Sequence, residues 1–300
     1  MPLWIPVTVA AASFQTVRFM LQKSLSEVRL SAAGATFSRF AYSAPFVLAV
    51  VLIYLGVSGR SLPDFTAMFW VYALIGGLSQ ILATVCVVLM FKQRNFAVGI
   101  TFKKTEVIQT ALLGLVVLGD HVSAGGLAAI LIGLVAVLVL SKTPESEGRW
   151  WQHLTNRASL IGLTSGVLFA FSAVAYRGAS LELGGLEPVL RASVTLAAVT
   201  TLQMVGMAVW LLLRDRAELR AVWNARRTAI FVGLTSMGGS FCWFLAFTLQ
   251  NAAYVKALGQ VELLLSLMAS VLFFKEQVTR RELLGMSLLG ASILVLVLAI

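Results

Sequence analysis

The sequence predicts an all-α membrane protein with ten transmembrane helices, arranged as two inverted five-helix repeats. Composition is the first indication, because 59% of the 300 residues are hydrophobic, only 12% are charged, and the mean hydropathy is +0.91. Soluble proteins carry about a quarter charged residues, so a soluble fold is excluded. The other indications are a succession of apolar stretches close to the roughly 20 residues that cross hydrocarbon, and an internal repeat.

Apolar stretches separated by short polar breaks define the predicted helices. The first stretch precedes the first basic residue, Arg18, whereas a cleaved signal peptide carries its positive charge before its apolar run. The polar segment 142–157 is the predicted linker between a first repeat, residues 1–141, and a second, residues 158–300. The ten predicted helices span residues 4–22, 31–57, 67–91, 96–118, 123–141, 158–181, 187–213, 227–249, 252–274 and 279–299.

Basic residues are distributed unequally between the two sides of the predicted bundle. The net charge is +10, and the loops that follow the odd-numbered helices contain fifteen lysines and arginines, whereas the opposite loops contain only Arg60. By the positive-inside rule, this bias predicts a bacterial-type cytoplasmic membrane protein with both termini outside. No basic stretch alternates with aromatic residues on a polar face, so we do not expect a nucleic-acid partner.

The sequence contains no pattern typical of a metal site or an enzyme. Cys86 and Cys242 lie within apolar spans, and His121 and His153 lie far apart in predicted loops. No nucleophile elbow or metal-ligand run falls in a span. We therefore expect no metal, no cofactor and no enzymatic activity, and a membrane-embedded enzyme or a scaffold is a less favoured interpretation.

The two halves are related by an internal repeat. Shifting the chain by 156 residues aligns the last three predicted helices of each half without a gap. With five helices per half, the second copy enters the membrane in the opposite direction, which is the inverted-repeat plan of secondary transporters. The shift pairs Cys86 with Cys242, Asn95 with Asn251, Glu106 with Glu262, Asp120 with Glu276, Gly77 with Gly233, and Phe91 with Phe247.

A resemblance to a known family lies in the twin segments NFAVGITFKKTEVIQTALLGLVVLGDHVS and NAAYVKALGQVELLLSLMASVLFFKEQVT. Each resembles the helix signature, ending in an acidic turn, of the drug/metabolite transporter superfamily, EamA type. Arg39 and Arg191 resemble the arginines near the start of the second and seventh helices of that family. The resemblance implies a ten-helix transporter. Where the family often has a proline after each glutamate, this chain has none, so no proline kink is expected there.

Two acidic residues are predicted to lie near the bilayer midplane. Glu106 and Glu262 each fall about ten residues into their helices, at 1.5 Å per residue. An unpaired carboxylate at that depth costs a few kcal/mol, so it must meet water, a cation or a proton. We expect both to hold the amine of a solute or to carry a coupled proton. A buried structural salt bridge is the alternative.

Polar groups near the two glutamates extend the candidate substrate site. Lys103 precedes Glu106 by three residues and therefore shares its helix face, which Gln109 continues. Lys256 lies one turn before Gln260 on the equivalent helix. These side chains offer ammonium and carboxylate partners for a zwitterion, or alternatively Lys103 only neutralises Glu106.

Three further residues are candidate ligands. Arg39 lies about eight residues into its helix, where its guanidinium could clamp a carboxylate. Trp243 and Tyr254 could stack on an apolar or aromatic solute or a quaternary amine, with simple packing as the alternative. Arg18 and Arg177 lie near predicted helix ends, so we expect both to snorkel to the headgroups.

These features predict a secondary transporter that moves a small organic metabolite, an amino acid or a similar zwitterionic or amine solute, by alternating access. Coupling to protons or to a counter-substrate would supply the energy. The alternative is an efflux pump for apolar organic cations. The family resemblance places helices 123–141 and 279–299 away from the cavity, as a candidate homodimer contact, and their small residues suit close packing: Ala129, Gly133, Gly285 and Gly290.

Overall fold

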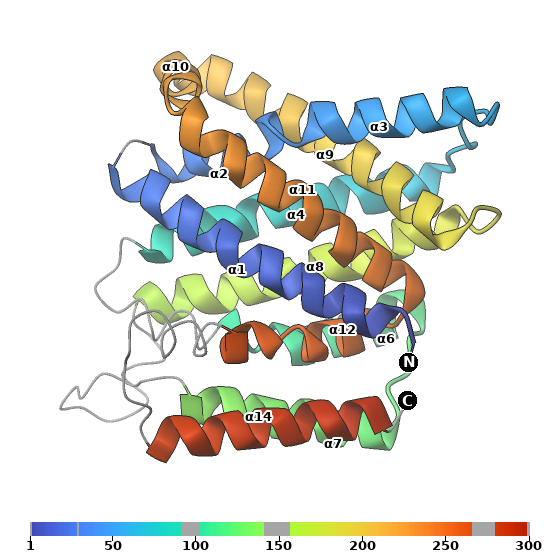
Figure 1. Cartoon of the computed structure of the whole chain (residues 1–300), viewed down its shortest axis with the longest axis vertical. Helices are drawn as coiled ribbons and strands as arrows, with labels where there is room; N and C mark the ends of the chain where they lie inside the picture. The colour runs from blue at the N-terminus through green and yellow to red at the C-terminus, as the bar shows by residue number, and fades with distance from the viewer. Residues whose placement is uncertain (1, 29, 92–102, 141–156, 266–279, 299–300) are drawn as a thin grey trace.

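The computed structural model describes residues 2–28, 30–91, 103–140, 157–265 and 280–298, and every regular element within them is a helix. Figure 1 shows the helices running side by side in stacked layers, with both chain termini at the same end of the bundle. In chain order they are α1 (Trp4–Val28), α2 (Ala32–Ala41), α3 (Ala44–Val57), α4 (Ala67–Phe91), α6 (Glu106–Leu118), α7 (Ala124–Leu140), α8 (Arg157–Glu182), α9 (Pro188–Arg214), α10 (Arg216–Asn224), α11 (Arg226–Leu249), α12 (Ala252–Leu258) and α14 (Arg280–Leu298).

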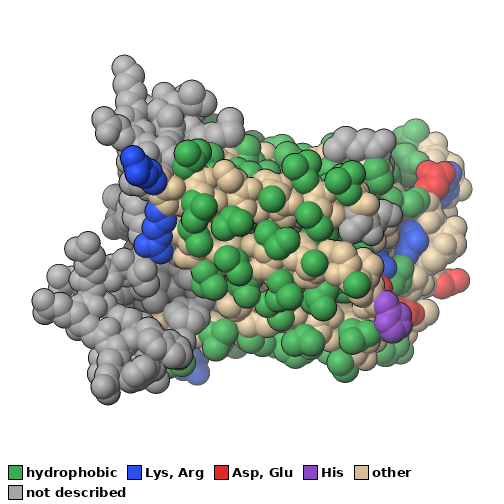
Figure 2. Space-filling view, turned by 90° about the horizontal axis from the view of Figure 1, so that it is seen from below, with side chains coloured by type: hydrophobic (Ala, Val, Ile, Leu, Met, Phe, Trp, Pro, Cys, Tyr) green, Lys and Arg blue, Asp and Glu red, His purple; other side chains and the backbone are tan. Residues whose placement is uncertain are grey.

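The outer surface of the bundle is apolar. Among the described residues, six segments are long and apolar enough to cross a membrane, and α6 and α7 are shorter apolar helices. Outward-facing side chains such as Ile53, Val116 and Leu294 are more than half exposed. Figure 2 shows a face covered by hydrophobic side chains, with Lys and Arg at both ends and Asp, Glu and His gathered at one of them. Because water disfavours so large an apolar surface, the chain is an integral membrane protein.

The predicted helices are found wherever the structure describes them, with two differences away from Glu106 and Glu262. The predicted helix 31–57 is divided into α2 and α3, because the chain turns at Tyr42 and Ser43 and Pro45 then starts a new helix. The sequence predicts a loop where α10 forms; Asp215 caps that short helix by accepting two backbone N–H bonds. Of the predicted linker, only Arg157 is described, and it begins α8.

The long helices pack in pairs that join the two halves of the chain. α4 lies against α8, α1 against α11, and α3 against α9. The first two pairs are reciprocal, since each joins the third predicted helix of one half to the first of the other. Close approach needs small residues here: a Cβ on Gly178 of α8 would lie 2.9 Å from the Tyr72 ring of α4. The interior is therefore built from both halves together.

Helices α7 and α14 form a separate pair at one edge of the bundle (Figure 1). The hydroxyl of Ser292 donates a 2.7 Å hydrogen bond to the carbonyl of Ala129 across this pair. A Cβ on Gly133 would lie 2.8 Å from Ser292 Oγ, and one on Gly285 would lie 2.5 Å from Leu140. These small residues therefore serve the contact between α7 and α14 within the chain, whereas a Cβ on Gly290 would meet open space. The homodimer contact stays a prediction.

Candidate functional site

Glu106 and Glu262 each follow a short turn that interrupts a helix. A turn at Lys104 and Thr105 precedes Glu106, which is the first residue of α6. After α12 ends, a turn at Gly259 and Gln260 precedes the helical residues 261–265, which include Glu262. The sequence predicts continuous helices at both places, and this prediction is wrong. The 156-residue shift brings the two breaks within one residue of each other, and helices interrupted inside the membrane are typical of solute and ion sites.

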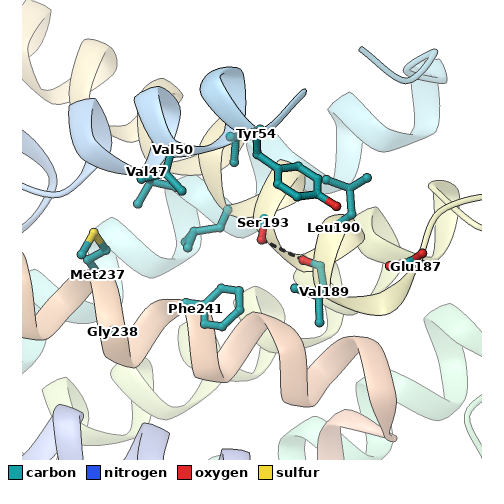
Figure 3. Close-up of a pocket in the computed structure, with 12 residues that line it drawn as sticks. Val47, Val50, Tyr54, Glu187, Val189, Leu190, Ser193, Met237, Gly238 and Phe241 are labelled. Carbon is teal, nitrogen blue, oxygen red and sulfur yellow. Dashed lines mark hydrogen bonds between the residues drawn. The ribbon is translucent and has the colours of Figure 1, made fainter. Parts of the chain in front are cut away.

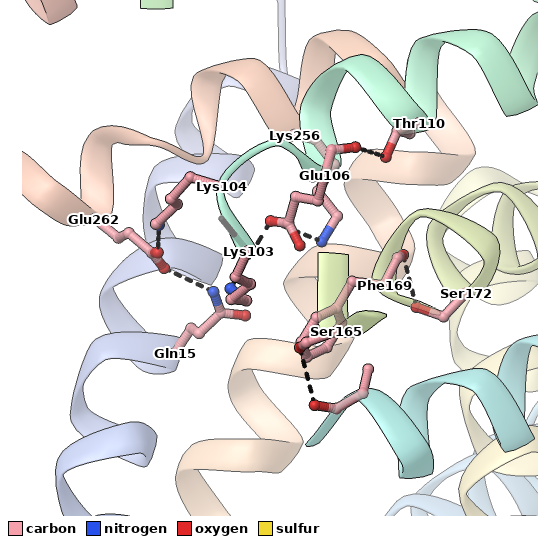
Figure 4. Close-up of polar contacts among 11 residues, drawn as sticks. Gln15, Lys103, Lys104, Glu106, Thr110, Ser165, Phe169, Ser172, Lys256 and Glu262 are labelled. Carbon is pink, nitrogen blue, oxygen red and sulfur yellow. Dashed lines mark hydrogen bonds and ion pairs between the residues drawn. The ribbon is translucent and has the colours of Figure 1, made fainter. Parts of the chain in front are cut away.

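Glu106 is a counter-ion shared by two lysines. Its carboxylate Oε1 lies 3.9 Å from Lys103 Nζ and 3.7 Å from Lys256 Nζ. The residue is only 4% exposed, and Oε2 has no hydrogen-bond partner among the described residues. The first turn of a helix also favours negative charge, because its backbone N–H groups point outward. The lysines approach from α12 and from the segment before α6 (Figure 4).

Glu262 is held by a different set of partners. Its Oε1 forms an ion pair with Lys104 Nζ, and its Oε2 accepts a 2.7 Å hydrogen bond from Gln15 Nε2 of α1. Figure 4 shows Lys104 and Gln15 on either side of this carboxylate. The glutamate of each half is thus paired with a lysine of the other half. The ion pairs Lys104–Glu262 and Lys256–Glu106 connect the halves crosswise.

Aromatic rings surround the buried ammonium groups. Lys256 Nζ lies 5.0 Å from the ring centroid of Trp243, 5.4 Å from that of Phe169 and 5.9 Å from that of Phe247. Lys103 Nζ lies 4.9 Å from the Phe169 centroid. Such contacts stabilise a cation that has lost its water. The ring of Trp243, a predicted ligand, therefore faces a lysine in this conformation, and its binding of a solute stays a prediction.

A narrow cavity next to these ion pairs is lined by two arginines. It has a volume of about 20 Å³, which is room for about one water molecule. Arg39 of α2 and Arg18 of α1 line it together with Lys256, Gln80 and Tyr176. The cavity is too small for an organic solute, so the site is closed in this structure.

Neither arginine of the cavity has a carboxylate partner among the described residues. Arg39 donates to three hydroxyls, those of Ser236 at 2.7 Å, Ser240 at 3.0 Å and Thr84 at 3.4 Å. Arg18 Nη1 is buried without a hydrogen-bond partner in the described part of the chain. The snorkelling predicted for Arg18 is wrong, because α1 continues to Val28 and leaves the side chain 4% exposed inside the bundle.

Three of the predicted site residues lie apart from the cavity. Gln109 donates to its neighbour Thr105 at 3.1 Å. Gln260 lines a crevice of about 10 Å³ between α6, α7 and α14, which Lys104 also lines. The hydroxyl of Tyr254 accepts a 2.7 Å hydrogen bond from the backbone N–H of Ser123, just before α7. Tyr254 and Gln109 thus bond to neighbouring protein groups, whereas Gln260 Oε1 and Gln109 Oε1 are buried without a hydrogen-bond partner among the described residues.

A buried polar network beside the cavity was not anticipated from the sequence. The Tyr176 hydroxyl donates to Gln80 Oε1 at 2.9 Å, and Gln203 Nε2 donates to the same oxygen at 3.0 Å. Gln80 lies on α4, Tyr176 on α8 and Gln203 on α9, so the network joins three helices. Polar residues inside apolar spans are the signal that could have identified it, since each must find a partner away from water.

A further ion pair, Arg177–Asp120, lies at the opposite end of α6. Arg177 of α8 makes a two-point contact with Asp120, through Nε at 2.7 Å and Nη2 at 3.1 Å. Its Nη1 also donates to the carbonyls of Phe247 and Gln250 at the end of α11. The snorkelling predicted for Arg177 is therefore wrong, because these partners hold the side chain between helix ends. Glu276, the repeat equivalent of Asp120, lies outside the described residues.

The larger hollows of the molecule are apolar and lie on its lateral surface. Figure 3 shows one of about 470 Å³ between α3, α9 and α11, where Val47, Tyr54 and Phe241 face each other. Another, of about 560 Å³, lies between α4 and α9. Neither is lined by the buried lysines and arginines. The charged site is therefore separate from the lateral grooves in this conformation.

The fold and the apolar spans are those of a polytopic membrane protein. Residues 156–298 match the EamA-like transporter family, which confirms the resemblance to the drug/metabolite transporter superfamily. A solved structure titled "Crystal structure of protein" is similar in fold, with a TM-score of 0.65 and 17% sequence identity, covering 97% of this chain and 99% of that chain. No curated protein matches the chain.

Proposed function

We propose that the chain is a secondary transporter that moves a small organic solute across the membrane by alternating access. The observation that carries this proposal is the crosswise pairing of Glu106 with Lys256 and of Glu262 with Lys104 at two matching helix breaks. Ionic groups inside a membrane protein are costly and mark solute or ion pathways. Pairs that join the two halves can also hold those halves together in one conformation.

Two inverted five-helix repeats would provide the moving parts. The 156-residue repeat supports this arrangement, and so do the reciprocal contacts of α4 with α8 and of α11 with α1. In such folds the two repeats move as bundles around a fixed central site. The cavity of about 20 Å³ is then an occluded state, which widens when the crosswise ion pairs separate on one side.

An efflux pump for apolar organic cations is the second candidate. The rings of Trp243, Phe169 and Phe247 around the Lys256 ammonium favour it, because the same rings could contact a cationic solute. Against it, each glutamate already has a lysine partner, and two arginines line the cavity. The solute transporter is therefore the function that the geometry supports best.

The charge distribution supports a cytoplasmic-membrane protein with both termini outside. Arg214, Arg216, Arg220, Arg226 and Arg227 flank or belong to α10, at the end of the bundle opposite the termini (Figure 1). A cysteine added to either terminus should react with a membrane-impermeant thiol reagent in intact cells. Protection of both termini would reverse the orientation without affecting the proposed transport.

Uptake by the purified full-length chain in proteoliposomes tests the function. The liposomes are loaded with one solute class at a time: amino acids, organic acids, phosphorylated metabolites or amines. Each class is assayed for solute exchange and for accumulation driven by a proton gradient. Glu106→Gln and Glu262→Gln should abolish or uncouple uptake, whereas Asp64→Asn removes one exposed carboxylate outside the site and serves as the control. Wild-type rates in both glutamate variants would contradict the proposal.

A further inference from the structure

The buried charges around the cavity do not balance. Five cationic side chains, Lys103, Lys104, Lys256, Arg18 and Arg39, are each less than 8% exposed. Against them stand only two carboxylates, those of Glu106 and Glu262, which leaves a formal charge of +3 among the described residues. Removing an ion from water costs several kcal/mol unless a counter-charge compensates it. The site as it stands therefore lacks negative charge.

Proton loss can relieve part of this excess, but not the part due to the arginines. A buried lysine can become neutral, and the three lysines are in any case close to the two glutamates. A guanidinium stays protonated in proteins. Arg18 and Arg39 line the same cavity, and the charges of the two side chains repel each other. Two permanent positive charges thus line one cavity without an acidic partner in the described part of the chain.

We propose that the transported solute carries an anionic group, a carboxylate or a phosphate, and that Arg18 and Arg39 bind this group in the cavity. The inference rests on the proposed transport function and names the chemical class of its substrate. An anion between the two guanidinium groups compensates their charge and satisfies the buried Arg18 Nη1, which has no hydrogen-bond partner among the described residues. Guanidinium groups bind carboxylate and phosphate oxygens through paired N–H donors.

The surroundings of Arg39 fit an exchangeable partner. Its three contacts are neutral hydroxyls, those of Ser236, Ser240 and Thr84, which position the guanidinium without neutralising it. An arginine kept for structure would be expected to have an acidic partner, as Arg177 has in Asp120. Both glutamates already face lysines from the opposite half, so an ammonium group on the solute would have to compete with those lysines. The anionic group is therefore the part of the solute that the two arginines recognise once the cavity has widened.

Thermal unfolding of the purified full-length protein tests this inference. The probes are sodium acetate, sodium succinate, sodium phosphate and tetraethylammonium chloride, each against sodium chloride at the same ionic strength. A ligand that binds only the folded state raises the Tm, and we expect a rise of at least about 2 °C with a carboxylate or with phosphate. Comparison of the Tm rise with succinate or acetate and the Tm rise with phosphate distinguishes a carboxylate from a phosphate as the preferred group. A rise with tetraethylammonium alone, or with no probe, would overturn the inference.

Substitutions separate ligand binding from a structural role. Arg18→Gln and Arg39→Gln should abolish the anion-dependent rise. Arg18→Gln should also leave the Tm without ligand unchanged or higher, because it removes a buried charge that has no acidic partner. Arg216→Gln, the same change on the exposed face of α10, should keep the full rise. An undiminished rise in Arg18→Gln, or a large fall of its Tm without ligand, would contradict the assignment.

Two further measurements complete the test. If Arg39→Gln does not fold, Arg39→Lys keeps the charge but loses the paired donors, and it should weaken anion binding at least about tenfold, since an ammonium group cannot form the two parallel hydrogen bonds of a guanidinium. Retention of wild-type affinity in Arg39→Lys would contradict the proposal.

The transport assay separates this inference from the proposed function. Transport of a purely cationic solute without anion binding would refute the inference and leave the transporter function standing. Wild-type uptake rates in both glutamate variants would refute the function itself.

Discussion

Glu106 and Glu262 occupy equivalent positions in the two halves, yet their surroundings differ. The side chain of Glu106 is 5% exposed and contacts two lysines at 3.7 and 3.9 Å. The side chain of Glu262 is 12% exposed and has one close lysine together with the amide of Gln15. A strict duplication would give both residues the same partners. The difference shows that the two halves adopt different local conformations in this one state.

Such asymmetry is what an alternating-access mechanism requires of two similar repeats. If both halves had identical conformations, the site would open equally to both sides or to neither. In the proposed mechanism, the more buried glutamate would belong to the half that is more tightly closed. We infer that opening on the other side would exchange the two environments, with Glu262 gaining the deeper position. Substitutions at both glutamates and at further positions test or refine this comparison.

The largest effect is expected from Glu106→Gln. The substitution leaves Lys103 and Lys256 without their shared counter-ion inside the bundle, and breaking a buried ion pair in this way costs about 3–5 kcal/mol. The Tm should fall markedly and uptake should be lost. Thermal unfolding in detergent, compared with the control Asp64→Asn, measures the change. A stability equal to that of the control would mean that the carboxylate is already neutral.

Glu262→Gln should destabilise the protein less than Glu106→Gln. Its side chain is partly exposed, and the Gln15 amide can still bond to the new side-chain carbonyl oxygen. Because Lys104 still loses its charge partner, a cost of about 1–3 kcal/mol is expected. The double variant Lys104→Met with Glu262→Gln should recover part of this cost, because no unpaired ion is left. A larger cost than for Glu106→Gln would reverse the assigned asymmetry.

The positions of the helices could be predicted from the sequence because lipid imposes one strong condition. Each crossing needs about 20 apolar residues whose backbone bonds are satisfied within the helix. The breaks before Glu106 and Glu262 could not be predicted, since no proline marks either of them. They depend on tertiary contacts: a Cβ on Gly259, for example, would lie 2.6 Å from the Trp243 ring. Hydropathy carries no information on such contacts.

The candidate site was predicted in part. The sequence indicates Glu106 and Glu262 because buried acids are rare in apolar spans, and the spacing of Lys103 indicates its contact with Glu106. The partners Lys256 and Lys104 come from the opposite half, which spacing along one helix cannot reveal. Arg18 was assigned to a headgroup because its helix was expected to end at residue 22 instead of Val28. Because the predicted end of this helix is six residues too early, the sequence does not identify Arg18 as a cavity residue.

Asp120→Asn tests the ion pair between Asp120 and Arg177, which lies away from the two glutamates. Arg177 would lose its acidic partner but would keep the carbonyls of Phe247 and Gln250. We expect a loss of about 1–3 kcal/mol, which is typical of a hydrogen bond to a charged group that is still partly satisfied. Solute affinity should stay unchanged, because this pair lies at the other end of α6. A changed affinity in the uptake assay would mean that the two regions are coupled.

The smallest effect is expected at Gly77 of α4, which the repeat makes equivalent to Gly233 of α11. A Cβ on Gly77 would lie 3.5 Å from Gln203, which is an ordinary contact. Alanine there should be neutral or stabilising by up to about 1 kcal/mol, because glycine is a poor helix former. A Cβ on Gly233 would lie 2.4 Å from Tyr42 Cβ and 2.8 Å from its backbone carbon, at the turn between α2 and α3.

Gly233→Ala should therefore cost about 1–3 kcal/mol, since backbone must move to make room. Thermal unfolding of the two single variants gives the comparison directly. The difference follows from the second helix of each half: the first half has a turn at Tyr42 that packs on α11, whereas α9 runs unbroken past Gly77. Equal effects at both glycines would mean that α2 and α3 straighten into one helix in solution, and the halves would then be more alike than this structure has them.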